Sequence, residues 1–281
     1  MTVRVAQVSD AHLCARRPFF MENFARVAED VRASKPALVL ATGDLTLGAG
    51  TDEDLAHGIA RHAEIGPELR CVPGNHDVGN EPGIGRGEAD AASVERWKRI
   101  AGPSVWVHDV PGWRLVGFDV QGLAFDPSAW DAIARAVRDA GTRSVALVQH
   151  KPLCADSVAD AAPDYWSMFP APRARLLALF GDARPALVIS GHVHQGRQRR
   201  ADGISQVWAP STAFILGDPW QPSLGTKVIG WVEHAFHADG THDARLRTVD
   251  GLRLDDLGRM PHVYRQLPTL DEKPDLWSVA R

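Results

Sequence analysis

Two pairs of metal-binding side chains stand directly after short apolar runs. Asp10 and His12 follow the run at 3–8, and His192 and His194 follow a later run. Because alternate residues of an extended segment project to the same side, each pair can bind one cation. Either pair alone is equally typical of an ordinary turn, so the rest of the sequence must decide between these two interpretations.

Three further apolar runs end in side chains of the same kinds. Taken singly, a carboxylate at such a place usually caps a helix, and a histidine there is unremarkable. With the two pairs, however, five runs carry in order D-x-H, G-D, G-N-H-D, H and G-H-x-H, which is improbable by chance. All of these side chains are of types that bind divalent metals. The three runs add Asp44, Asn75 with His76, and His150.

The five runs predict buried strands, and the amphipathic segments between them predict helices. The carboxyl ends of strands are where open α/β sheets place their sites. We predict helices at 19–32, 51–64 with Thr51 as N-cap, 127–140 and 172–181, strands near 105 and at 115–118, and mostly strands from 204 onward. No repeat or linker divides the chain, so we expect one α/β sandwich domain at 1–250 and a polar C-terminal extension at 251–281.

The composition restricts the function classes. The 281 residues hold 31 Lys+Arg, 35 Asp+Glu and 12 His, with a formal charge of −4, which disfavours a dedicated nucleic-acid binder. Three scattered cysteines form no C-x-x-C pair, which disfavours a disulfide scaffold or a thiolate zinc site. No apolar stretch approaches the roughly 20 residues that cross a bilayer, and no secretory leader precedes the first run. We therefore expect a cytoplasmic protein that does not contact membranes.

The ordered five-part motif resembles the calcineurin-like metallophosphoesterase superfamily over about residues 3–250. The resemblance implies a four-layer αββα sandwich of two mixed β-sheets flanked by helices. It also implies two divalent or transition metal ions, of which Mn, Fe, Zn and Co all suit such ligands. The implied roles, by position, are Asp10, His12 and His194 on the first metal, Asn75, His150 and His192 on the second, and Asp44 bridging both.

In that family the histidine at the position of His76 stabilises the phosphoryl transition state or protonates the leaving oxygen. Two cations about 3.5–4 Å apart can clamp the attacking and departing oxygens of an in-line displacement, with a bridging hydroxide as nucleophile. Asp77 is a candidate to orient the His76 ring, and equally a turn or cap residue.

Other segments indicate which subfamily of this superfamily the sequence resembles. No tyrosine follows Asp44, unlike the purple acid phosphatases, and the GDxxDRG and GNHE sequences of the protein phosphatases are missing. Six segments are similar to the class III cyclic nucleotide phosphodiesterases and their glycerophosphodiesterase relatives. They are DAHL (10–13), ATGDLT (41–46), VPGNHD (72–77), HKPL (150–153), APST (209–212) and GWVEHAFHADG (230–240).

The resemblance therefore implies hydrolysis of a small phosphodiester, either a cyclic nucleotide or a glycerophosphodiester. One alternative is a phosphomonoesterase or a pyrophosphatase acting on a nucleotide-linked lipid precursor. The other is a binding or scaffold protein that keeps the fold without turnover.

Two long loops are the candidates for substrate recognition. The loop at 79–93 follows the G-N-H-D turn and forms either a pocket wall or a solvated loop. The loop at 155–170 carries Tyr165, which can stack on a ligand or pack in a homo-oligomer interface. Arg16 and Arg17 can bind a phosphate bidentately or lie solvated on the surface. The expected partner is thus a small phosphate ester.

Overall fold

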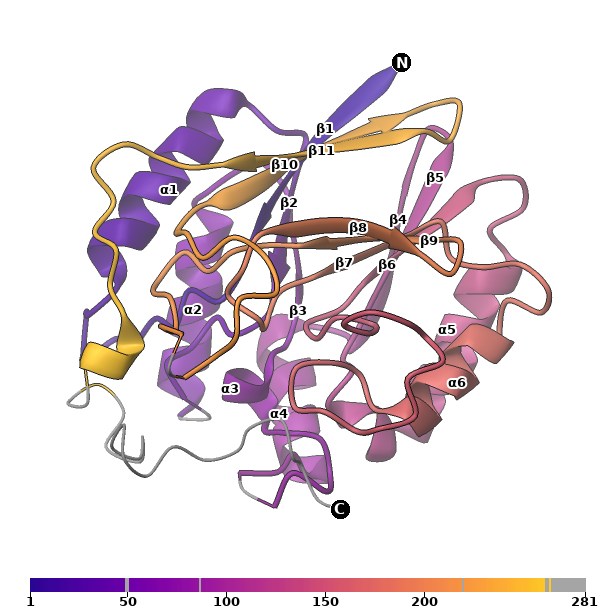
Figure 1. The fold of residues 1–281 in the computed structure, drawn as a ribbon, viewed down its shortest axis with the longest axis horizontal. Helices are drawn as coiled ribbons and strands as arrows, with labels where there is room; N and C mark the ends of the chain where they lie inside the picture. Colours follow the sequence, from indigo (N-terminus) through magenta and orange to yellow (C-terminus); the bar gives the residue numbers. More distant parts are fainter. Residues whose placement is uncertain (49–50, 86, 219, 261–262, 264–281) are drawn as a thin grey trace.

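Two mixed β-sheets face each other at the centre of the molecule (Figure 1). The computed structural model describes residues 1–48, 51–85, 87–218, 220–260 and 263. The five-stranded sheet has the order β11 (His242–Arg247), β10 (Trp231–His237), β1 (Thr2–Val8), β2 (Leu38–Thr42) and β3 (Leu69–Val72). The six-stranded sheet has the order β4 (Val105–Val110), β5 (Trp113–Phe118), β6 (Ser144–Val148), β7 (Leu187–Ser190), β9 (Ile204–Trp208) and β8 (Arg197–Ala201).

Strand direction is uniform in the middle of each sheet. β1, β2 and β3 are parallel to one another, and so are β5, β6, β7 and β9. β10 and β11 in one sheet, and β4 and β8 in the other, pair antiparallel with their neighbours. Within each sheet, the carboxyl ends of the parallel strands therefore lie along one edge.

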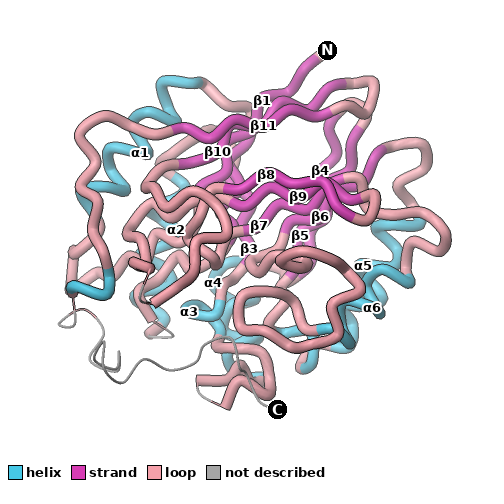
Figure 2. Tube along the Cα trace, viewed as in Figure 1, coloured by secondary structure: helices cyan, strands magenta, loops and turns pink. Residues whose placement is uncertain are grey.

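Helices cover the outer face of each sheet, which completes four layers (Figure 2). Helices α1 (Met21–Ser34), α2 (Asp52–Ala63) and α4 (Ala91–Ala101) pack with β1 and β2 in one core cluster. Helices α5 (Pro127–Arg138) and α6 (Pro170–Ala178) pack with β5, β6 and β7 in a second. A third cluster lies between the sheets. The predicted αββα sandwich of two mixed sheets is confirmed.

The apolar runs are continuous because their strands are buried on both faces. In β1, Val5 belongs to the cluster between the sheets, whereas Ala6 and Val8 belong to the cluster under the helices. In β2, Leu38 and Leu40 face the other sheet in the same alternating way. Each such strand therefore joins a helix layer to the central layer.

Most predicted helices lie within a few residues of their expected positions. The predicted cap is confirmed, since the Thr51 side chain accepts a hydrogen bond from the Asp54 amide at the start of α2. The helix expected at 172–181 begins earlier, at Pro170, with Pro at the first turn.

Helix α4 and strand β8 are among the elements that were not predicted. Helix α4 begins inside the expected 79–93 loop, where Asp90 caps it by accepting from the Ser93 amide. Its buried side chains are Val94 and Trp97, and Ile100 is partly buried against the same cluster. The small residues at its start continue the Gly-rich loop sequence, which hides the beginning of the helix. Strand β8 has the highly charged sequence RQRRA, which suits an edge strand but gives no apolar alternation.

The first part of the expected C-terminal extension packs on the domain. The Arg253 amide donates to Asn23 on α1, and Leu257 is buried in a short 3-10 turn, η2 (Leu257–Arg259). Trp277, near the end of the expected extension, lies outside the described residues. In the described part of the chain, no helix is long and apolar enough to cross a membrane.

Truncating Trp97 tests the role of the unpredicted helix. Its side chain is 1% exposed within the cluster under the helices, so Trp97→Ala should lower the free energy of unfolding by about 3–5 kcal/mol. Exposed Glu95 on the same helix is the control, and Glu95→Ala should change stability by less than about 0.5 kcal/mol. Chemical denaturation measures both. Equal effects would show that α4 is not held by its buried face.

Candidate metal centre

The ends of five parallel strands bring the motif residues together from both sheets. β1, β2 and β3 lead into Asp10 with His12, Asp44, and Asn75 with His76, and β6 and β7 lead into His150 and the His192–His194 turn. The turn after β9 packs against the turn after β1, since the Ser211 hydroxyl donates to the Asp10 carbonyl at 2.7 Å. The predicted residues thus converge although they span most of the chain.

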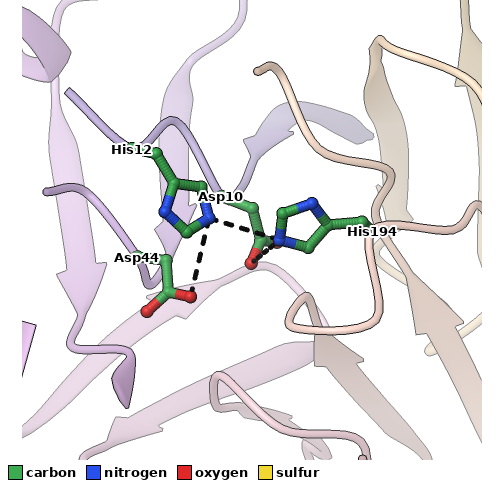
Figure 3. A group of neighbouring side chains, drawn as sticks. All are labelled: Asp10, His12, Asp44 and His194. Carbon is green, nitrogen blue, oxygen red and sulfur yellow. Dashed lines mark hydrogen bonds and ion pairs between the residues drawn. The ribbon is translucent and has the colours of Figure 1, made fainter. Parts of the chain in front are cut away.

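One buried group consists of Asp10, His12, Asp44 and His194 (Figure 3). His12 Nε2 lies 3.2 Å from His194 Nε2 and 3.7 Å from Asp44 Oδ2. His194 Nε2 lies 3.3 Å from Asp10 Oδ1. Potential ligand atoms of the four residues all lie within 4.8 Å of one another, so they can hold one cation.

A second buried group consists of Asp44, His150 and His192. His150 Nε2 lies 3.3 Å from Asp44 Oδ2 and 3.2 Å from His192 Nδ1. The Asn75 side-chain oxygen lies 3.2 Å from the same His150 nitrogen, which places the amide beside this group. Asp44 therefore belongs to both groups, in the position of a bridging carboxylate.

The outer nitrogens of three rings are bound to backbone carbonyls. His150 Nδ1 lies 2.7 Å from the Thr42 carbonyl, His194 Nδ1 lies 3.0 Å from that of Phe214, and His192 Nε2 lies 3.0 Å from that of Tyr165. A carbonyl only accepts, so each outer nitrogen carries the hydrogen and a neutral ring turns its lone pair toward the group. Lone pairs and carboxylates facing one another at these distances fit a shared cation.

The backbone at these turns is in an uncommon conformation. Asp10, His12, Asp44, His192 and His194 have φ values of +53°, +47°, +50°, +67° and +55°. Asp and His tolerate the left-handed region better than most residues, but it still costs about 1–3 kcal/mol per residue. Such strain at five residues of three converging turns is typical of a functional site.

Two glycines allow the close approach of the turns. A Cβ on Gly43, whose φ is +92°, would collide with the His150 ring, and a Cβ on Gly74 would collide with the Asp44 carboxylate. The G-D and G-N-H-D motifs therefore need glycine for steric reasons.

Burial and mutual charge shape the protonation of the groups. Burial, with a contribution from His76, lowers the pKa of His12 well below its usual value, and burial with His150 does the same for the pKa of His192. Burial disfavours the charged imidazolium of His150 too, but the Asp44 carboxylate outweighs this and raises its pKa to about 9. His12 and His192 are thus neutral at neutral pH, and a cation binding here would have to displace the proton of His150.

His76 lies beside the first group without belonging to it. Its backbone amide donates to Asp44 Oδ1 at 2.8 Å, and its ring centroid lies 4.7 Å from that of His12. Its Nδ1 lies 2.9 Å from the Leu47 carbonyl, which fixes the hydrogen on Nδ1 of the neutral ring. Asp77 accepts from the amides of Thr46 and Gly74 and so holds the turn, while the Leu47 carbonyl orients the His76 ring.

The structure does not bring Arg16 and Arg17 to the donor groups. Arg16 forms an exposed ion pair with Glu53 at 2.8 Å, and Arg17 is exposed. The 155–170 loop, in contrast, reaches the second group through Tyr165, whose hydroxyl accepts from the Asn75 amide at 3.4 Å. Tyr165 thus contacts Asn75 through its hydroxyl and His192 through its carbonyl. The only sequence signal for these contacts was the aromatic character of the loop.

A buried ion pair beside the second group was also not predicted. Lys151, directly after His150, is fully buried, and its Nζ lies 2.5 Å from Glu81 Oε2. The ammonium also lies 5.2 Å from the centre of the Tyr165 ring. The HKPL segment gives no hint that this lysine is buried. Lys151 thus connects the His150 turn to the 79–93 loop through Glu81 and to the 155–170 loop through Tyr165.

Comparisons with solved structures show the same fold at low sequence identity. A purple acid phosphatase from yellow lupin (Lupinus luteus) matches with a TM-score of 0.64 and 16% identity, and the chain is covered fully but spans only 57% of that protein. GAP50, described as the anchor in the inner membrane complex of Plasmodium, matches with a TM-score of 0.57 and 15% identity over 100% of this chain and 99% of that one. No curated protein sequence matches the chain.

The sequence itself matches a family model. The model of the calcineurin-like phosphoesterases covers residues 3–196, which include all five parts of the motif. The four-layer fold and the buried Asp/His groups at the strand ends agree with that match. The chain belongs to the calcineurin-like phosphoesterase family.

Proposed function

We propose that the protein is a dinuclear-metal phosphodiesterase that hydrolyses a small phosphodiester, either a cyclic nucleotide or a glycerophosphodiester. The observation that carries the proposal is the position of Asp44, which contributes to two adjoining buried donor groups. Two cations held close together by one carboxylate can clamp both the attacking and the departing oxygen of an in-line phosphoryl displacement.

The donor atoms divide naturally between two ions. Asp10, His12 and His194 would hold one, and Asn75, His150 and His192 the other, with Asp44 shared. Nitrogen and oxygen donors of this kind suit Mn, Fe, Zn and Co alike. When bound, such ions activate water for attack and neutralise charge that develops on the phosphoryl oxygens.

His76 is placed to act on the leaving group. It lies beside the first group, it is partly exposed, and its Nδ1 is committed to the Leu47 carbonyl. Nε2 is therefore the ring nitrogen that would exchange a proton with substrate. It would donate to the departing oxygen from the ring form that carries hydrogens on both nitrogens, and it would keep only the Nδ1 hydrogen afterwards. Asp77 supports this by holding the turn that carries His76.

The charges around the site favour a diester over a monoester. A monoester carries an additional negative charge that cationic side chains must offset. Lys151, the cation next in chain to His150, is already paired with Glu81, and Arg16 is paired with Glu53. A monoanionic diester needs less compensation than a dianionic monoester, and this supports the choice that the DAHL, VPGNHD and HKPL segments first suggested.

The state of the cysteines also fits the proposal. The three cysteines are free thiols, as expected in a reducing cytoplasm, where we place the enzyme. A scaffold role is the alternative from outside the enzymes, since GAP50 shares the fold and is described as an anchor. A fold does not fix function, but the complete set of seven donors with His76 beside them favours turnover.

Initial rates on aryl phosphodiesters and aryl phosphomonoesters test the substrate class. With Mn²⁺ added, the diester should be hydrolysed with the higher kcat/KM, because the available positive charge matches a monoanion. Cyclic nucleotides and glycerophosphodiesters in the same panel identify the natural ester. A preference for the monoester would reverse the assignment, and no hydrolysis with any metal would favour the scaffold role.

Replacing His76 tests its role in proton transfer. His76→Ala should lower kcat by about 10²–10⁴-fold, because leaving-group protonation is lost, while both metals stay bound. Activity should recover on diesters whose leaving group is a good one, such as p-nitrophenolate, since these need no proton. Metal content by mass spectrometry is the control, and loss of metal in this variant would show that His76 is a ligand.

Replacing Asp44 tests metal binding, and a second buried carboxylate, Asp119, serves as the control. Asp44→Asn should weaken binding of both ions, because the Asp44 carboxylate belongs to both donor groups. Asp119, which is 3% exposed and accepts from the Gly122 amide, lies outside both groups, so Asp119→Asn should bind two ions like the parent protein. Loss of only one ion in Asp44→Asn, measured by calorimetry, would argue against a shared carboxylate.

A further inference from the structure

Gln7 is a fully buried polar side chain in the middle of the sandwich. It lies on β1 in an otherwise apolar stretch, and it is 0% exposed. Strand alternation places it on the same face as Val5, which packs in the cluster between the two sheets. A buried amide is costly unless each of its polar atoms has a partner.

Every hydrogen-bonding group of the Gln7 side chain is used. Nε2 donates to Thr42 Oγ1 at 2.9 Å and to the Ser190 carbonyl at 2.9 Å. Oε1 lies 3.0 Å from His234 Nε2, which donates to it. All three partners are buried, so the network forms without water.

The partners of Gln7 are the last residues of strands that carry metal-binding turns. Thr42 ends β2, two residues before Asp44, and Ser190 ends β7, two residues before His192. The bond to Ser190 crosses from the five-stranded to the six-stranded sheet. One amide therefore connects two turns that must meet to complete the second donor group.

His234 fixes which way the amide points. Because Gln7 Oε1 can only accept, His234 carries its hydrogen on Nε2, and its Nδ1 accepts from His242 Nε2 at 2.9 Å. A reversed amide would set its oxygen against the Ser190 carbonyl and its NH₂ against the His234 N–H. Burial also lowers the pKa of His234 well below its usual value, which keeps the ring neutral.

Thr42 extends the connection to a ligand. Its carbonyl accepts from His150 Nδ1 at 2.7 Å, while its hydroxyl accepts from Gln7. A shift of Thr42 would therefore turn the His150 ring and move Asp44 together. Hydrogen-bonding partners behind metal ligands typically contribute 10–100-fold to metal affinity.

We propose that Gln7 is a positioning residue of the dinuclear centre, which holds the β2 and β7 turns in register across the two sheets, with His234 fixing the orientation of its amide. The inference rests on the proposed metal centre, because it concerns how that centre is assembled.

Two variants separate positioning from stability. Gln7→Leu removes the link between the turns and leaves His234 Nε2 without an acceptor, so it should lower both the melting temperature of the metal-free protein and the metal affinity. Adding His234→Leu removes the stranded donor. His242 loses its partner as well, but it is only partly buried and can bond to water instead, so replacing both Gln7 and His234 by apolar groups costs little stability. The double variant should regain most of the melting temperature while its metal affinity stays 10–100-fold below that of the parent protein.

Val5→Ala is the matched control. Val5 is 1% exposed, on the same strand and the same face, and it packs in the cluster between the sheets. Its truncation should lower the melting temperature while the Mn²⁺ affinity, measured by calorimetry on chelator-treated protein, stays within about twofold of the parent value.

The outcomes are distinguishable. Lower affinity in both Gln7 variants but not in Val5→Ala supports the inference. Parent-like affinity in Gln7→Leu, recovery of affinity in the double variant, or equal loss in Val5→Ala would each overturn it. A parent protein that binds no Mn²⁺ at all would contradict the proposed function itself, and this inference with it.

Discussion

The carboxylate of Asp44 is shared by two buried donor groups that draw their other members from two different sheets. Asp10 and His12 follow β1 of the five-stranded sheet, whereas His150, His192 and His194 follow β6 and β7 of the six-stranded sheet. A carboxylate can serve both groups only if the two sheets meet in a fixed register at this edge. The architecture described above follows from this requirement.

Several local features become intelligible under that constraint. The turns adopt left-handed conformations at Asp44 and His192 because regular strands would carry these side chains past one another. Gly43 and Gly74 have no side chain because His150 and Asp44 occupy the space. Favourable packing elsewhere must offset this strain, and the three large core clusters, one on each outer face and one between the sheets, supply it.

Much of this could be predicted from the sequence, because the signals are local. A buried strand followed by a polar turn is visible in a few residues, as at Asp10 or His192, and the family resemblance then groups the five turns. The structure confirmed the sandwich and brought all eight motif residues together. It did not bring Arg16 to the donor groups, because Arg16 pairs with Glu53 on the surface. Such a pair between distant residues leaves no pattern in the sequence, so it could not be predicted.

What could not be predicted depends on contacts between distant residues. Gln7 resembles a minor interruption of an apolar run, since its partners lie 35, 183 and 227 positions away. Lys151 resembles a surface lysine until Glu81 and Tyr165 are seen around it. Helix α4 was overlooked because its first residues continue the Gly-rich and small-residue sequence of the 79–93 loop. Interactions of this kind appear only once the chain is folded.

Anomalous X-ray scattering from crystals grown with Mn²⁺ tests the central claim most directly. The account predicts two peaks about 3.5–4 Å apart, one among Asp10, His12 and His194 and the other among Asn75, His150 and His192, with an Asp44 oxygen bound to both. A single peak, or two peaks that do not share Asp44, would contradict it.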